Sequence, residues 1–220
     1  MPSGELAYTV RRSPRARRVR VRVEATGEVL VTLPTRARAR EAAAAVRELR
    51  PWIDRRLSEV QAARAAVVRP AGTMPYLGGV LELREQPERT RAHRRGDVLL
   101  VPAGDGAGAA IERWYRRAAR TEIAPRVDRA TAALGVRHAS ITIRDQRTRW
   151  GSCSPSGALA FNWRLLLGPE AVLDYVVWHE ACHLVVFNHS PRFWALLERH
   201  LPGYAAPRRW LRDNGIALQP

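Results

Sequence analysis

Hydrophobic and polar residues alternate along residues 17–33, on both sides of a break at Thr26-Gly27. Alternation with a period of two around such a break is typical of a β-hairpin. The pattern then becomes helical from Thr35, a candidate N-cap, to about Leu49. Pro51 suits the first turn of a second helix. The chain therefore begins with a predicted hairpin followed by two helices.

Residues 76–101 have a strand-like pattern, and the glycine- and alanine-rich stretch Pro102–Ala110 after them is the best linker candidate in the chain. We therefore expect a mixed, strand-rich N-terminal region over residues 1–105 and a second domain over residues 106–220. Helical and strand-like segments occur in both parts, so the expected fold class is α+β.

The second domain is predicted to contain a helix over about Ala109–Leu134, interrupted or kinked near Pro125, and then a strand over Ser140–Arg144. A turn-rich stretch leads to a second strand, Ala158–Leu167, and Pro169 opens another helix. The second strand has two equally good interpretations. It is either a sheet edge that accepts an extended peptide by β-augmentation or an ordinary core strand.

Residues 179–183 read His-Glu-Ala-Cys-His. Residues four apart lie on one face of a helix, about 6 Å apart along its axis, so the imidazoles of His179 and His183 can bind one metal ion. Glu180 points about 100° away from them, close enough to polarise a metal-bound water without becoming a ligand. The apolar residues on both sides indicate a buried helix. The alternative is that the two histidines are only packed in the core.

His189 is the candidate third ligand. A continuous helix would rotate it by about 240° from His183, onto the wrong face. Asn188 is, however, a candidate left-handed C-cap, and Ser190-Pro191 is typical of the start of a new helix. His189 is therefore expected in a tight turn that folds it back toward the metal. Three protein ligands with an open fourth position are typical of catalytic zinc.

Other residues fit the metal site less well. Glu198 and His200, in the next expected helix, are weaker candidates for the third ligand. Cys182 lies on the wrong side of its helix to be a fourth ligand and is better explained as a small buried residue. The metzincin pattern does not fit, because it needs glycine where residue 186 is valine and a methionine turn that this chain lacks.

The chain carries a formal net charge of +16, and all 37 of its basic residues are arginine. Such a charge favours a polyanionic partner such as nucleic acid, bound through the basic surface. The absence of lysine beside abundant alanine equally fits the residue bias of a GC-rich genome. Because the arginines are spread along both halves of the chain, a solvated surface is favoured over a specific site.

An apolar share of 46% is typical of a globular protein. No apolar run approaches 18 residues, and the N-terminus lacks the apolar core of a signal peptide, so we expect a cytoplasmic protein with no membrane partner. The two cysteines, Cys153 and Cys182, are too few for a disulfide framework.

Residues 148–197, which contain the RWGSC and HEACH segments, closely resemble the YgjP-like metallopeptidases, relatives of the SprT-like and WLM zinc peptidases. Weaker similarity extends to residues 17–34 and 51–57. The resemblance implies a zincin-like catalytic domain that binds one zinc ion. The family's HExxH motif and third histidine map to His179, Glu180, His183 and His189.

The RWGSC segment allows three interpretations. Arg149 could lie near the metal and stabilise a developing oxyanion. Alternatively, the segment is a rigid turn with Trp150 packed under the helix, which we favour. Cys153 as a nucleophile is the weakest option, because nothing in the sequence places a base beside it.

We therefore expect a zinc-dependent hydrolase, most simply a metalloendopeptidase that acts on a peptide or protein. Zinc activates a water, and Glu180 takes its proton as general base. The all-imidazole ligand set favours zinc over other divalent ions. Two alternatives stay open: a metal-dependent nucleotide phosphoanhydride hydrolase (pyrophosphatase), and a DNA-associated protease with a basic binding surface.

Overall fold

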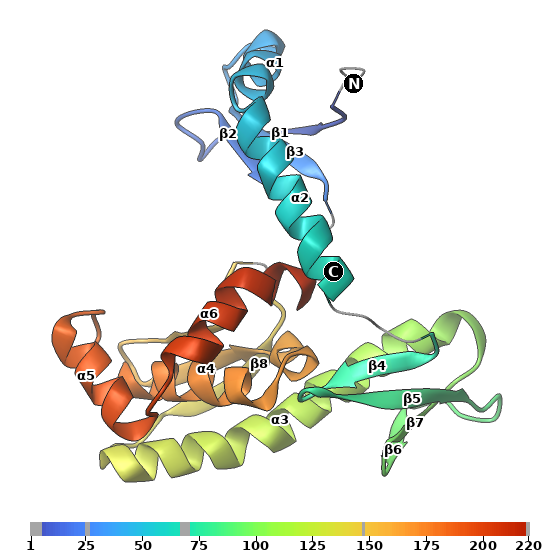
Figure 1. Cartoon of the computed structure of the whole chain (residues 1–220), viewed down its shortest axis with the longest axis vertical. Helices are drawn as coiled ribbons and strands as arrows, with labels where there is room; N and C mark the ends of the chain where they lie inside the picture. The colour runs from blue at the N-terminus through green and yellow to red at the C-terminus, as the bar shows by residue number, and fades with distance from the viewer. Residues whose placement is uncertain (1–5, 25–26, 67–70, 147, 219–220) are drawn as a thin grey trace. The chain divides into compact units, whose positions relative to one another are not determined.

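The structure is a computed structural model that describes residues 6–24, 27–66, 71–146 and 148–218 (Figure 1). Over these residues it combines six α-helices with three small sheets of mixed strand direction, which confirms the α+β class. The chain forms two compact units. The N-terminal unit comprises Met1–Val68 with Asp213–Pro220, and the larger unit comprises Arg69–Arg212.

The N-terminal unit contains a three-stranded sheet in the order β1-β3-β2. β1 (Thr9–Ser13) runs parallel to β3 (Val29–Pro34), and β2 (Arg20–Val23) runs antiparallel to it. The β2–β3 pair confirms the predicted hairpin. Thr26 of the predicted break lies outside the described residues, while Gly27 has a φ of 85°, which glycine adopts without strain.

Helices α1 (Ala39–Glu48) and α2 (Arg50–Ala66) follow and pack on this sheet (Figure 1). α1 begins later than the cap predicted at Thr35. The Glu41 carboxylate accepts a hydrogen bond from the Arg38 backbone N–H at 2.8 Å and so fixes the first turn there. The two helices and the sheet bury a common core of Val23, Val29, Val31, Leu33, Ala42, Val46, Ile53 and Val60.

The larger unit begins with a four-stranded sheet in the order β4-β5-β7-β6. Its strands are β4 (Thr73–Tyr76), β5 (Gly79–Glu85), β6 (His93–Arg95) and β7 (Val98–Val101). The stretch expected to be a linker instead forms the 3-10 turn η1 (Gly104–Gly106) and the start of a long helix. The division between compact units falls at residue 68, whereas the sequence suggested residue 105.

The long helix α3 (Ala107–Leu134) continues through Pro125 without the predicted interruption. It packs along α4 and along the 3-10 helix η2, both described below. Its buried Tyr115 donates a hydrogen bond from the hydroxyl to the Pro75 carbonyl oxygen, which connects α3 to β4. α3 is therefore a central support of the larger unit.

A second small sheet, in the order β8-β10-β9, lies in the same unit. β10 (Ala158–Asn162) pairs in parallel with β8 (Ser140–Arg144) and antiparallel with β9 (Gly151–Cys153). β10 is therefore a core strand, and the alternative that it forms a peptide-accepting edge is wrong. The edge strand beside it is β9, which lies within the stretch that the sequence suggested to be rich in turns.

β10 ends five residues earlier than predicted, because Asn162 caps a new element. The Asn162 side-chain oxygen accepts a hydrogen bond from the Arg164 backbone N–H at 3.0 Å. This bond opens the 3-10 helix η2 (Trp163–Leu167). The remaining elements are α4 (Glu170–Cys182), α5 (Pro191–His200), α6 (Ala205–Asn214) and η3 (Gly215–Leu218). None of the described helices is both long and apolar enough to cross a membrane.

Candidate metal centre

Helix α4 carries the first histidine of the HEACH segment near its C-terminal end. Its apolar residues Val172, Leu173, Val176 and Val177 are buried, as the sequence predicted for this helix. Arg126 of α3 holds the N-terminal part of α4, since its guanidinium pairs with Glu170 and with Asp174. The last turn of α4 is thereby placed at a fixed position in the larger unit.

The chain turns sharply after Cys182. His183 still has helical backbone angles, φ −66° and ψ −19°, but the N–H groups of Leu184 and Val185 form tight turn bonds of 3.0 Å to the carbonyls three residues earlier. The predicted left-handed cap at Asn188 is wrong, because Leu77 is the one described non-glycine residue with positive φ. Asn188 acts through its side chain, which accepts a hydrogen bond from the Ser190 N–H at 3.3 Å.

This turn brings three histidines together. The Nε2 atoms of His179 and His183 are 3.2 Å apart, those of His183 and His189 are 3.1 Å apart, and those of His179 and His189 are 2.9 Å apart. A tetrahedral zinc with Zn–N bonds of 2.0–2.1 Å requires a nitrogen separation of about 3.3 Å. The three nitrogens therefore surround a point that fits a single ion.

The protonation of the rings suits metal ligands. His183 donates a hydrogen bond from Nδ1 to the Val186 carbonyl oxygen at 3.0 Å, which leaves the lone pair on Nε2 facing the cluster. Burial lowers the pKa of His183, and burial together with the two other histidines lowers the pKa of His179 to about 3. Both rings are therefore neutral at pH 7.

Helix α5 supports the cluster with aromatic side chains. Phe193 stacks on His183 with 4.6 Å between ring centroids and meets His179 and His189 edge-on at 4.9 Å. Trp194 stacks on the His189 ring at 5.5 Å and donates a hydrogen bond from Nε1 to the His189 carbonyl oxygen at 3.1 Å. These contacts fix His189 although the residue is exposed.

Glu180 lies on another side of α4, only 6% exposed. Its carboxylate packs against Gly151 of β9, where an added Cβ would lie 2.6 Å from Glu180 Oε1. Burial raises the pKa of Glu180 to about 7, while the Arg149 guanidinium opposes this rise. A carboxyl group that titrates near neutral pH can both accept and return a proton.

The other candidate metal ligands and the candidate nucleophile do not join the histidine cluster. Glu198 accepts a hydrogen bond from the Gly203 N–H at 3.3 Å, and His200 stacks on Trp178 at 5.2 Å. Cys182 is fully buried and is not among the clustered groups. Burial, followed by the nearby Glu180 carboxylate, raises the pKa of Cys153 to about 11, which disfavours a nucleophilic thiolate.

The structure adds Arg208 of α6, a residue that sequence reasoning missed. Its guanidinium carbon lies 4.3 Å from the centroid of the Trp194 ring, and its charge contributes to the lowered pKa of His179. The Tyr204 ring stacks on Trp194, with 5.5 Å between ring centroids, and on Tyr175, with 6.3 Å between ring centroids. No spacing rule connects α6 with the histidines, so only the fold could reveal this second cation.

Three imidazoles that converge on one point, with a buried glutamate next to the first of them in the sequence, are typical of a mononuclear metal-dependent hydrolase. Comparison with family models agrees with this class. The model described as "YgjP-like, metallopeptidase domain" matches residues 17–214. The chain belongs to this family of YgjP-like metallopeptidases.

Two solved structures of metallopeptidase zymogens are similar to part of the chain. Abylysin of Pyrococcus abyssi is 22% identical over 41% of this chain and 93% of its own chain, with a TM-score of 0.38. Jannalysin of Methanocaldococcus jannaschii is 21% identical over 41% of this chain and 86% of its own, with a TM-score of 0.36. A search of curated proteins finds no match.

Proposed function

We propose that this protein is a zinc-dependent metalloendopeptidase with a zincin-like catalytic domain, in which His179, His183 and His189 hold one zinc ion. The convergence of their three Nε2 atoms to within 3.2 Å of one another carries the proposal. Zinc bound there would lower the pKa of a water and polarise the scissile carbonyl. Family membership supports peptides or proteins as the substrate class.

In this proposal Glu180 is the general base. It takes a proton from the attacking water and returns it to the amine that leaves when the peptide bond breaks. Its burial and its pKa of about 7 favour both transfers at neutral pH. Gly151 contributes by leaving the space that the carboxylate occupies.

Two arginines are candidates for stabilising the charge that develops on the carbonyl oxygen. Arg149 acts on Glu180 through space, and Arg208 contacts Trp194, whose ring stacks on His189. A preorganised cation near this oxygen lowers the transition-state energy more than it would in water. We assign this role to Arg149, Arg208 or both.

The substrate backbone would bind along β9. Among the described strands it pairs with β10 alone, so its other side forms an edge of the three-stranded sheet. Its first residue, Gly151, touches Glu180, so an extended peptide added to β9 would run past the general base. A bound peptide that continues past Glu180 in both directions would place residues on both sides of the scissile bond, as an endopeptidase requires.

The decisive test combines metal content with activity. Purified protein, His189→Ala and Glu180→Gln are analysed for zinc by mass spectrometry and assayed for cleavage of unfolded casein. We expect about one zinc per parent chain, little in His189→Ala, and a full complement in an inactive Glu180→Gln. The control is His200→Ala, because His200 was the rival ligand and stacks outside the cluster.

The proposal fails if His189→Ala keeps both zinc and activity, or if Glu180→Gln cleaves casein as fast as the parent. Release of pyrophosphate from nucleoside triphosphates is measured in parallel. Metal-dependent release of pyrophosphate without casein cleavage would instead identify a phosphoanhydride hydrolase.

A further inference from the structure

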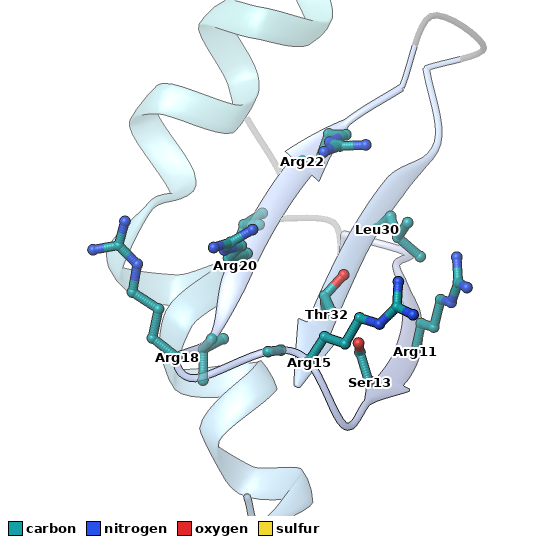
Figure 2. A pocket seen from close by; sticks show the side chains of 11 residues that line it. Arg11, Ser13, Arg15, Arg18, Arg20, Arg22, Leu30 and Thr32 are labelled. Carbon is teal, nitrogen blue, oxygen red and sulfur yellow. The ribbon is translucent and has the colours of Figure 1, made fainter. Parts of the chain in front are cut away.

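A pocket of about 700 Å³ lies in the N-terminal unit, along the sheet formed by β1, β3 and β2 (Figure 2). Arginine supplies five of its lining residues: Arg11, Arg15, Arg18, Arg20 and Arg22. Figure 2 shows Arg11 and Arg15 on the β1 side and Arg18, Arg20 and Arg22 on the β2 side, with Thr32 between them. We call this group the arginine pocket.

The strand periodicity places these side chains on one face. In β3, Val29, Val31 and Leu33 are buried in the core with α1 and α2, whereas Leu30 and Thr32 line the pocket. The arginine pocket is therefore on the face opposite the helices.

The strand register aligns two of the arginines with a hydroxyl group. Thr32 pairs with Arg11 of β1 and with Arg20 of β2, so the three residues form a row across the sheet. Strands are about 4.8 Å apart, which puts one arginine on either side of the Thr32 hydroxyl. The row presents hydrogen-bond donors and positive charge at the centre of the pocket.

The positive charge of the arginine pocket is not neutralised by the described part of the protein. Arg11, Arg15, Arg18 and Arg20 form no ion pair with a described residue, and Arg22 has only a long contact of 3.8 Å to Glu24. By contrast, Arg12 donates hydrogen bonds of 2.8 Å to the carbonyls of Thr35 and Ala37, which is a structural role. The pocket arginines have no comparable structural partner among the described residues.

The local density of arginine also differs from the rest of the chain. Residues 11–22 contain seven arginines and no acidic residue. A genomic bias toward arginine explains a high total, but it does not explain why five of these seven line one pocket. The placement, rather than the net charge, points to a ligand.

We propose that the arginine pocket binds the phosphate backbone of a nucleic acid. Guanidinium groups bind phosphate oxygens in a bidentate manner, and serine and threonine hydroxyls such as those of Ser13 and Thr32 are common additional donors. The described lining offers arginine and hydroxyl donors for phosphate, and phosphate contacts carry no sequence information, so binding is independent of base sequence. An anionic membrane is a poorer fit, because the described lining residues include no aromatic anchor for a bilayer.

The test measures the affinity of the full-length protein for a fluorescently labelled 20-base-pair DNA duplex between 50 and 200 mM salt, by anisotropy. The double variant Arg11→Ser/Arg20→Ser removes both ends of the central row. We expect its affinity to fall at least tenfold and the slope of log affinity against log salt to decrease by about 2, since each phosphate contact contributes about 0.9. A duplex of unrelated sequence should give the same result.

The matched control is Arg40→Ser/Arg47→Ser, which removes the same charge from two exposed positions of α1 in the same unit. We expect this control to bind within about twofold of the parent. An equal loss of duplex affinity in both double variants would overturn the proposal, because binding would then depend on the total positive charge and not on the arginine pocket. Absence of duplex binding by the parent at 50 mM salt, with or without binding to vesicles of 30% phosphatidylserine, would overturn it as well.

Discussion

Gly151 of β9 and Glu180 of α4 are so close that a Cβ at Gly151 would lie 2.6 Å from both Cγ and Oε1 of the glutamate. Glycine is thus needed at residue 151 for space. The contact connects the edge strand of a sheet with the proposed general base. It also explains the glycine of the RWGSC segment by its contact with Glu180, which none of the three interpretations of that segment from sequence included.

Gly151→Ala is expected to push the Glu180 carboxylate out of its position while leaving the three histidines in place. The activity toward unfolded casein should fall at least 100-fold, within the range that general-base catalysis contributes, and the zinc content should stay at the parent level. Activity and zinc are measured on the same preparation.

The control for this substitution is Gly79→Ala. Gly79 also lies in a strand, but a Cβ there would meet the nearest atom at 3.6 Å, an ordinary contact. Gly79→Ala should have an activity within about twofold of the parent protein. Parent-like activity of Gly151→Ala would show that Glu180 does not depend on this contact.

Local sequence patterns predicted the elements that carry the site, but not all of their ends. The apolar pattern around His179 predicted a buried helix, and Ser190-Pro191 predicted a new one, so the return of His189 toward His179 and His183 could be deduced. The mechanism of the turn was predicted wrongly, because Asn188 uses its side chain rather than a left-handed backbone. A side-chain hydrogen bond across two residues leaves no periodic signal.

Features that depend on contacts between distant segments could not be predicted. β9 is only three residues long and contains glycine and serine, so its pairing with β10 decides that it is a strand. Arg208 of α6 comes near His179 through the fold alone, where its guanidinium lies over the Trp194 ring of α5. The arginine pocket likewise required the strand register, since composition alone cannot tell a localised charge from a dispersed one.

Arg149 and Arg208 can be separated by parallel substitutions to glutamine. If a guanidinium stabilises the developing oxyanion, its removal lowers kcat by about 100-fold and changes KM little. Arg209→Gln is the control, because this exposed neighbour of Arg208 is not at the site. Steady-state kinetics with a fluorogenic peptide show whether Arg149, Arg208 or both have this role. A change in KM alone would instead assign the arginine to binding of the substrate.

Arg126 should stabilise the larger unit by joining α3 to α4. Its side chain is 11% exposed and pairs with Glu122 at 2.6 Å and Asp174 at 3.0 Å. Arg126→Met should lower the free energy of unfolding by about 1–3 kcal/mol, because charge-assisted hydrogen bonds are lost. The loss stays in this range because water can hydrate the carboxylates that Arg126 no longer contacts. Urea denaturation measures the change. Arg129→Met, at an exposed position of the same helix, should change it by less than about 0.5 kcal/mol.

The Cys153 thiol should be unreactive at neutral pH, which distinguishes a site based on metal and carboxylate from one based on a cysteine nucleophile. Burial and the Glu180 carboxylate both disfavour the thiolate, so they raise the pKa of Cys153 from 9.0 to about 11. Because only the thiolate reacts, alkylation by iodoacetamide should be slow at pH 7 and rise about tenfold per pH unit until the pH reaches that pKa. Mass spectrometry of the intact protein follows the reaction, with urea-unfolded protein as the fast control. Cys153→Ala should keep parent activity, and rapid labelling at pH 7 that abolishes casein cleavage would contradict the metal-based mechanism.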